Sequence, residues 1–87
     1  MEMKRGQIVR SKAGRDQGDF LTVLRADPPY IILCDGKHRP LDHAKRKKMM
    51  HVSPTLTVLS EDQLKTNRKI RAALRQFSKQ YPRDLPD

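Results

Sequence analysis

The 87-residue sequence has no tryptophan, only four Phe and Tyr together, and a single cysteine. A lone thiol forms no internal disulfide, which excludes a disulfide-stabilised secreted scaffold. No apolar run approaches the roughly 20 residues of a membrane-spanning helix. The start of the chain also has no apolar region of the kind found in secretion signals, so we expect a cytoplasmic protein.

Acidic residues are scarce relative to basic ones. Ten Asp and Glu stand against nineteen Lys and Arg, and the formal net charge is +9. An excess of this size on a small domain is typical of proteins with a polyanionic partner, and nucleic acid is the first such partner to consider. The chain is long enough for one small core and one binding surface, which argues against a multi-domain enzyme.

Catalytic and metal-binding patterns are also missing. The Asp residues are spread over predicted turns, whereas general acid–base catalysis needs carboxylates that meet in a pocket. The potential zinc ligands fit no compact finger by their spacing, and Cys34 sits in an apolar segment. We therefore expect no enzyme, no metal site and no cofactor; the residues considered as zinc ligands are Cys34, His38, His43 and His51.

The residues from 5 to 59 carry the pattern of a β domain. Apolar residues alternate or form short runs, and Gly, Pro and Asp-Gly separate them. Five short strands joined by tight turns fit a small, strongly bent barrel, and Pro40 favours an edge position for the fourth. The strands expected are Gln7–Ser11, Asp19–Arg25, Tyr30–Cys34, a return strand Lys37–Leu41 after the Asp35-Gly36 hairpin, and a fifth near His51-Val52 or Leu56–Leu59.

The residues from 60 to 81 have the pattern of a helix. Ser60 and Gln63 match a capping box, and Pro82 would stop the helix. An apolar stripe at helical spacing consists of Ile70, Leu74, Phe77 and Tyr81, while Leu64 lies off it. The opposite face is entirely cationic, with Lys65, Arg68, Arg71, Arg75 and Lys79. Because the barrel needs the apolar stripe as a cover, we expect no membrane partner.

The segment from Gly6 to Leu24 consists of a strand, a loop with glycines at 14 and 18, and a second strand. It resembles a KOW motif, the unit of the SH3-like barrels in ribosomal proteins and some transcription elongation factors. The order of segments over residues 5–56 is similar to the large-subunit KOW ribosomal proteins of archaea and eukaryotes and to short bacterial RNA-binding KOW proteins. The resemblance implies an SH3-like barrel whose glycine loop lies against ribosomal RNA, with Gly18 at the family's loop glycine. Gln17 departs from the Lys that commonly precedes this glycine.

The basic residues of several segments are candidate RNA contacts. Lysine and arginine beside a glycine loop supply donors to phosphates, and backbone N–H groups can approach phosphates where glycine leaves room. A run of four consecutive bases is best tolerated next to phosphates. The candidate RNA-binding residues are Lys12, Gly14, Arg15 and Gly18 in the loop, Lys37 and Arg39 in the hairpin, Lys45, Arg46, Lys47 and Lys48 in the basic run, and Arg68, Arg71 and Arg75 in the helix.

These features predict a monomeric, ribosomal or ribosome-associated protein that binds structured RNA, most readily ribosomal RNA. The scarcity of aromatic residues favours recognition of the RNA backbone over stacking on single-stranded bases. A protein-interaction module that docks a transcription or translation factor is the competing interpretation. Salt dependence separates the two, because affinity based on phosphate contacts falls steeply with salt.

Overall fold

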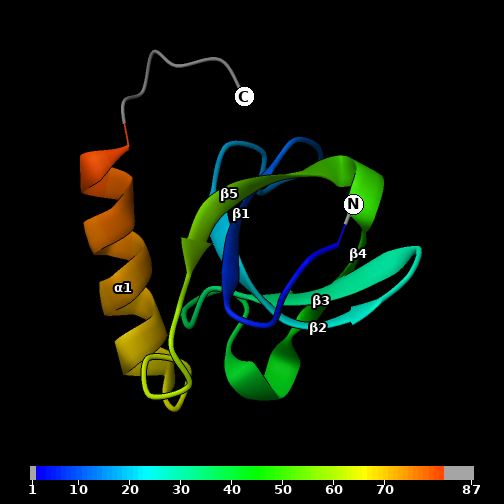
Figure 1. The fold of residues 1–87 in the computed structure, drawn as a ribbon. Coiled ribbons are helices and arrows are strands. Elements are labelled where there is room, and N and C mark those ends of the chain that lie inside the picture. Colours follow the sequence, from blue (N-terminus) through cyan, green and yellow to red (C-terminus); the bar gives the residue numbers. More distant parts are fainter. Residues whose placement is uncertain (1, 82–87) are drawn as a thin grey trace.

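The computed structural model describes residues 2–81 and contains one five-stranded antiparallel sheet and one helix (Figure 1). The predicted fold class, mostly β with a C-terminal helix, is confirmed. The elements are β1 (Gln7–Ser11), β2 (Phe20–Asp27), β3 (Tyr30–Cys34), the 3-10 helix η1 (Leu41–His43), β4 (Lys45–Lys48), the 3-10 helix η2 (Met49–His51), β5 (Val52–Val58) and α1 (Asn67–Gln80).

The sheet curls strongly but does not close into the expected barrel. Its strand order is β4-β3-β2-β1-β5, so β4 and β5 form its two edges. These two strands are consecutive in the chain and are joined by η2, which turns the chain across the open side of the curl (Figure 1). The domain therefore has an enclosed interior without a continuous ring of strand pairs.

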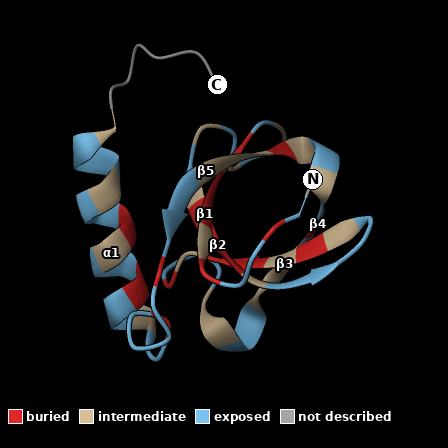
Figure 2. Cartoon of the chain, viewed as in Figure 1, coloured by how far each residue is buried: buried red, intermediate tan, exposed pale blue. Residues whose placement is uncertain are grey.

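Apolar residues line both faces of the sheet. Alternation along each strand sends one set into the curl and the next set towards α1, so that Val9 packs in the inner cluster and Ile8 packs with the helix residues. Figure 2 shows buried positions along the sheet and on the side of α1 that faces it. The inner core contains Met3, Val9, Leu21, Val23, Ile31, Leu33 and Val52. The outer core contains Ile8, Cys34, Leu59, Leu64, Ile70 and Leu74.

The fourth strand was predicted in the wrong place. Residues 37–41 form no strand, because the Asp35 carboxylate accepts hydrogen bonds from the backbone N–H groups of Lys37 and Arg39, both at 2.8 Å, and holds them in a tight loop. The strand that returns beside β3 is the basic run itself, with Ile31 paired to Lys47. The fifth strand, β5, runs from Val52 to Val58 and so overlaps both candidate segments, while His51 belongs to η2 and Leu59 follows the strand.

The helix begins later than predicted. The capping box exists, since Ser60 N donates to Gln63 Oε1 at 2.9 Å and Gln63 N donates to Ser60 Oγ at 3.2 Å, but it caps a single turn. The cap of α1 is Thr66, whose Oγ1 accepts from Lys69 N at 3.1 Å. The break lets Leu64, which lies off the helical stripe, enter the outer core beside Ile70.

α1 ends at Gln80, and the predicted stop, Pro82, lies outside the described residues. Within residues 2–81, no helix is long and apolar enough to cross a membrane.

Candidate functional site

The four residues of the basic run form β4, so their side chains point alternately to the two faces of the sheet. Arg46 and Lys48 are exposed on the outer face of β4, whereas Lys45 is half-buried and Lys47 is buried. The Arg46 guanidinium lies 3.9 Å from the centre of the Tyr30 ring, a cation–π contact that holds it against the strand. Of the four candidate RNA contacts in this run, Lys47 is therefore not on the surface.

Lys47 belongs to a buried polar network. Its side chain is 6% exposed, and its Nζ donates to Asp16 Oδ1 at 2.8 Å, to Ser11 Oγ at 2.8 Å and to the backbone carbonyl of Ala13 at 2.6 Å. Three acceptors satisfy the three N–H groups of the ammonium, as a buried charge requires. Lys47 thus ties β4 to the glycine loop and presents no free charge to a ligand.

Asp16 is the anionic centre of this network. Its Oδ1 also accepts from Ser11 Oγ at 2.7 Å, and its Oδ2 lies 3.4 Å from Lys45 Nζ. Burial opposes ionisation of this carboxyl, but the hydrogen bonds from Lys47 and Ser11 and the charges of both lysines outweigh it. The pKa of Asp16 is consequently lowered to about 2.

The glycine loop turns through two left-handed backbone positions. Gly14 and Gly18 both have positive φ, +86° and +91°. The N–H of Gly18 donates to Ser11 O at 2.8 Å and the N–H of Gln17 donates to Gly14 O at 3.2 Å. These two N–H groups stabilise the loop and are not free to bind phosphate.

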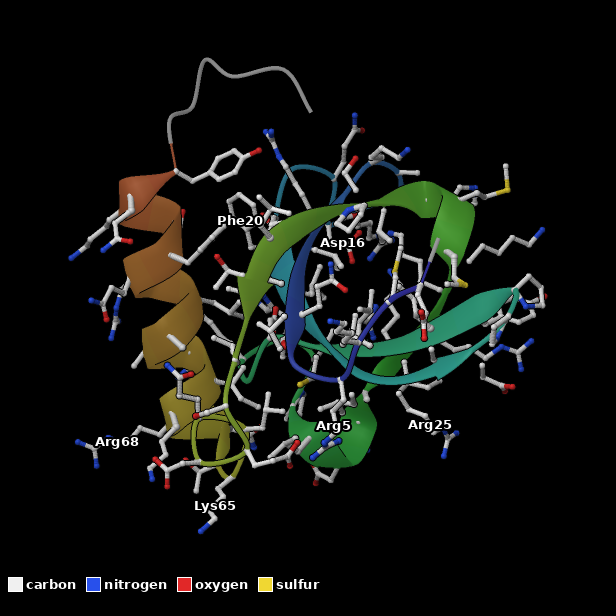
Figure 3. The ribbon with its side chains drawn as sticks, viewed as in Figure 1. Arg5, Asp16, Phe20, Arg25, Lys65 and Arg68 are labelled. Atoms are coloured by element: carbon white, nitrogen blue, oxygen red, sulfur yellow. The ribbon has the colours of Figure 1, made fainter. Side chains whose placement is uncertain are left out.

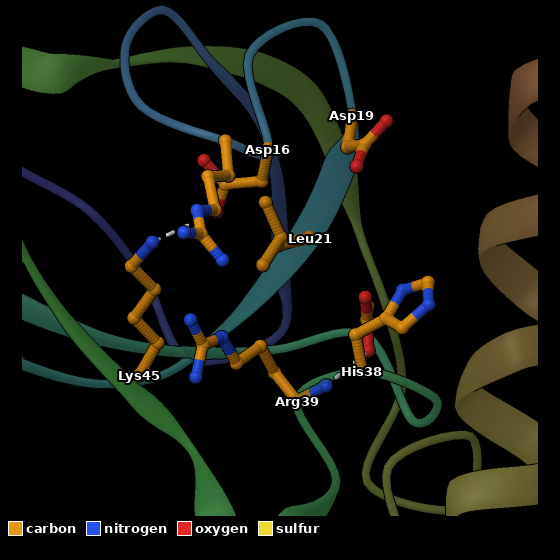
Figure 4. Close-up of a pocket in the computed structure, with 8 residues that line it drawn as sticks. Asp16, Asp19, Leu21, His38, Arg39 and Lys45 are labelled. Atoms are coloured by element: carbon orange, nitrogen blue, oxygen red, sulfur yellow. Dashed lines mark hydrogen bonds and ion pairs between the residues drawn. The ribbon is translucent and has the colours of Figure 1, made fainter.

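A groove brings three of the predicted bases together (Figure 4). Arg15 from the glycine loop, Arg39 from the 35–40 loop and Lys45 from β4 line a groove of about 440 Å³. Both arginines are exposed, and the groove is floored by the core residue Leu21. Its other lining residues are Asp16, Asp19, Asp35 and His38.

The 35–40 loop is held in place from two sides. Its turn places Arg39 on the groove, while Gly36 packs against the helix start, where an added Cβ would overlap the backbone oxygen of Asn67. Asn67 Oδ1 also accepts from Leu41 N at 2.8 Å. Lys37 is exposed on the same loop but does not line the groove.

The three predicted helix bases have different surroundings. Arg75 lines a shallow hollow of about 230 Å³ with Gly18 and Asp19, beside the groove. Arg71 NH1 donates to Gly36 O at 2.9 Å and fastens the helix to the 35–40 loop. Arg68 is exposed near the helix start and points away from the sheet (Figure 3).

A second basic hollow, of about 430 Å³, adjoins the glycine loop and includes Arg10, which was not predicted as a candidate RNA contact. The exposed Lys12 lines it too, together with Ser11, Gln17 and Gly18. The Arg10 guanidinium lies 5.9 Å from the Phe20 ring centre and its Nε donates to Gly18 O at 3.4 Å. Arg10 could have been predicted from the sequence, because it lies near the end of β1, directly before the glycine loop.

Cys34 is one of the four potential zinc ligands that the sequence analysis considered. Cys34 is fully buried in the outer core, and burial first, with the nearby Asp35 second, raises the pKa of its thiol to about 11. Over residues 2–81, no three His, Cys, Asp or Glu side chains converge to hold a metal ion.

No protein-family model matches the chain, and no curated protein matches it.

Proposed function

We propose that this protein binds structured RNA through phosphate contacts, as a cytoplasmic, monomeric, ribosomal or ribosome-associated protein without catalytic activity. Ribosomal RNA is the target that the resemblance to KOW proteins implies. The net charge of +9 supports a polyanionic partner.

The convergence of Arg15, Arg39 and Lys45 on one groove carries the proposal. These bases come from three segments of the chain that are separated in sequence, and the folded backbone holds them around a single hollow. Two guanidinium groups supply forked donors and the ammonium supplies a point charge, a combination suited to phosphate oxygens. Arg75 extends the cationic surface onto the helix.

The aromatic residues support recognition of the RNA backbone over base stacking. Phe20 makes edge contacts with Phe77 and Tyr81, at centroid distances of 5.2 and 5.0 Å, and Tyr30 is covered by Arg46. These rings pack against the protein's own residues, whereas single-strand binders present rings to bases. The surface therefore suits RNA whose fold fixes its phosphates in space.

A protein-docking role is the second candidate, and one observation favours it. An apolar hollow of about 460 Å³ lies at η2 and the start of β5, lined by Met3, Met49, Met50, Val52 and Pro54 among others. Met50 is exposed, and Leu56 on β5 is fully exposed. Exposed apolar residues beside an apolar hollow favour a docking surface for a protein partner.

Binding to purified ribosomal RNA over a series of salt concentrations tests the proposal. The variant Arg15→Gln/Arg39→Gln removes two exposed groove bases, and Lys4→Gln/Arg25→Gln removes two exposed bases outside the groove. If the groove binds phosphates, the first variant flattens the slope of log affinity against log salt by about two units, and the second leaves it nearly unchanged.

Equal slopes for the wild type and both variants would contradict the groove assignment. A Met50→Ser/Leu56→Ser variant tests the second candidate, because loss of a protein partner from this variant, with RNA affinity unchanged, would favour docking.

A further inference from the structure

The groove carries charges of both signs. Its bases are Arg15, Arg39 and Lys45, and its carboxylate Asp16 is ion-paired with Lys45 and with Lys47. Asp19 and His38 lie on the side of the groove opposite Lys45 (Figure 4). Asp19 therefore places a carboxylate on the same groove as the bases that are proposed to bind phosphates.

Asp19 is the carboxylate in the groove that is left without a partner. The carboxylates of Asp16 and Asp35 accept hydrogen bonds from the protein, but within residues 2–81 the exposed Asp19 carboxylate has none. Its backbone is nevertheless fixed, because Asp19 N donates to Asp16 O and Asp19 O accepts from Ser11 N, both at 2.9 Å. The chain thus holds an unpaired acceptor at a defined place on the groove.

An ionised carboxylate near bound RNA either repels the phosphates or accepts a hydrogen bond from the RNA. The donors that RNA offers are the ribose 2′-hydroxyl and the exocyclic amino groups of bases. Either donor lies within one nucleotide of a phosphate, and a groove of about 440 Å³ is in the size range of small-molecule sites.

We propose that the groove seats one ribonucleotide of the bound RNA, with its phosphate against Arg15, Arg39 and Lys45 and with Asp19 accepting a hydrogen bond from the 2′-hydroxyl or an exocyclic amine. Asp19 is then a specificity-determining residue, and this inference rests on the proposed RNA binding. The sign of its effect is diagnostic. Deleting a merely solvated carboxylate strengthens binding to a polyanion, whereas deleting a carboxylate that accepts a hydrogen bond weakens it.

The test compares Asp19→Ala with Asp27→Ala, which deletes an exposed carboxylate outside the groove and changes the net charge equally. The probes are an RNA hairpin with an unpaired loop, the DNA hairpin of the same sequence, the 2′-O-methyl RNA, and the RNA with inosine in place of its guanosines. The Asp19 variant should bind the RNA hairpin about tenfold more weakly than the wild type, and the Asp27 variant should not.

The modified hairpins identify the donor. If the wild type binds the 2′-O-methyl RNA more weakly than the unmodified RNA, the donor is the ribose 2′-hydroxyl, and the wild type should then bind the DNA hairpin weakly as well. If the wild type binds the inosine RNA more weakly than the unmodified RNA, the donor is a guanine amine. If the Asp19 variant binds the RNA as tightly as the Asp27 variant does, the inference is wrong and RNA binding stands. If the wild type binds none of the hairpins and no ribosomal RNA, the proposed function itself fails.

Discussion

Lys47 Nζ and Asp16 Oδ1 lie 2.8 Å apart and join the basic run of β4 to the glycine loop. The pair uses one base of the KRKK segment as an internal connector, since the ammonium of Lys47 is surrounded by protein acceptors. The loop that carries Arg15 is therefore held at a fixed distance from the strand that carries Lys45.

Stability should depend on the ionisation of Asp16. Because the folded-state pKa is lowered from 3.8 to about 2, the carboxylate contributes stability above about pH 4, and that contribution is lost as the pH falls through 2. The amount is about 2 kcal/mol at neutral pH. Urea unfolding of the wild type and of Asp16→Asn at several pH values between 7 and 2 measures it.

The variant should be less stable than the wild type at pH 7, because the buried Lys47 loses its counter-charge. The two free energies of unfolding should approach one another as the pH falls. Asp27→Asn, an equal change of charge at an exposed site, is the control and should behave as the wild type does. A constant difference between Asp16→Asn and wild type at all pH values would contradict the prediction.

Two glycines with positive φ should differ in their tolerance of alanine. Gly18 has φ +91° and open space where a Cβ would stand, so Gly18→Ala should cost about 1 kcal/mol from backbone strain alone. Gly36→Ala should cost more, because its methyl group would overlap the backbone oxygen of Asn67. Thermal melting of both variants gives the order, and equal losses would show that the helix start moves aside freely.

The helix cap should be sensitive to mutation at Thr66 and insensitive at Ser60. Thr66→Ala removes the acceptor of Lys69 N and should lower stability by about 1 kcal/mol together with the helical circular-dichroism signal. Ser60→Ala loosens only the turn before the helix and should leave that signal intact. A loss of helicity in the Ser60 variant would mean that the helix in solution begins at residue 60.

Arg75 and Arg71 should separate RNA binding from stability. Arg75→Gln removes an exposed base beside the glycine loop and should flatten the salt dependence of RNA binding by about one unit without changing the melting temperature. Arg71→Gln breaks the hydrogen bond to Gly36 O and should lower stability by about 1 kcal/mol. If both variants change the salt dependence and the melting temperature by the same amounts, Arg75 and Arg71 do not have these separate roles.

The sequence predicted the fold class because period-two alternation, Gly loops and a helical stripe are local patterns. It missed the positions of two elements for reasons that lie outside those patterns. The fourth strand lies elsewhere because Asp35 closes a loop with its own side chain, and the helix starts later because Thr66 caps it, after a break beside the buried Leu64. In both places a side chain forms hydrogen bonds with the nearby backbone and so favours one local structure over another.

The sequence predicted that the candidate site is basic, but it could not predict which bases are exposed or which side chains meet there. A count of bases cannot tell Lys47, which faces inward, from Lys48, which faces solvent, until the register of β4 against β3 is known. The roles of Asp16 and Asp19 were equally hidden, because an acid among bases in a loop becomes informative only when its neighbours in space are known. Asp16 meets two lysines from a strand about 30 residues further along the chain.

The outer core has a consequence for synthesis of the chain. Ile8, near the start, is covered by Ile70 and Leu74, which are translated more than 60 residues later. Until those residues leave the ribosome, the emerging strands display one apolar face that nothing covers. A contact so distant in sequence forms late, and until it does the apolar face of the sheet can associate with other apolar surfaces.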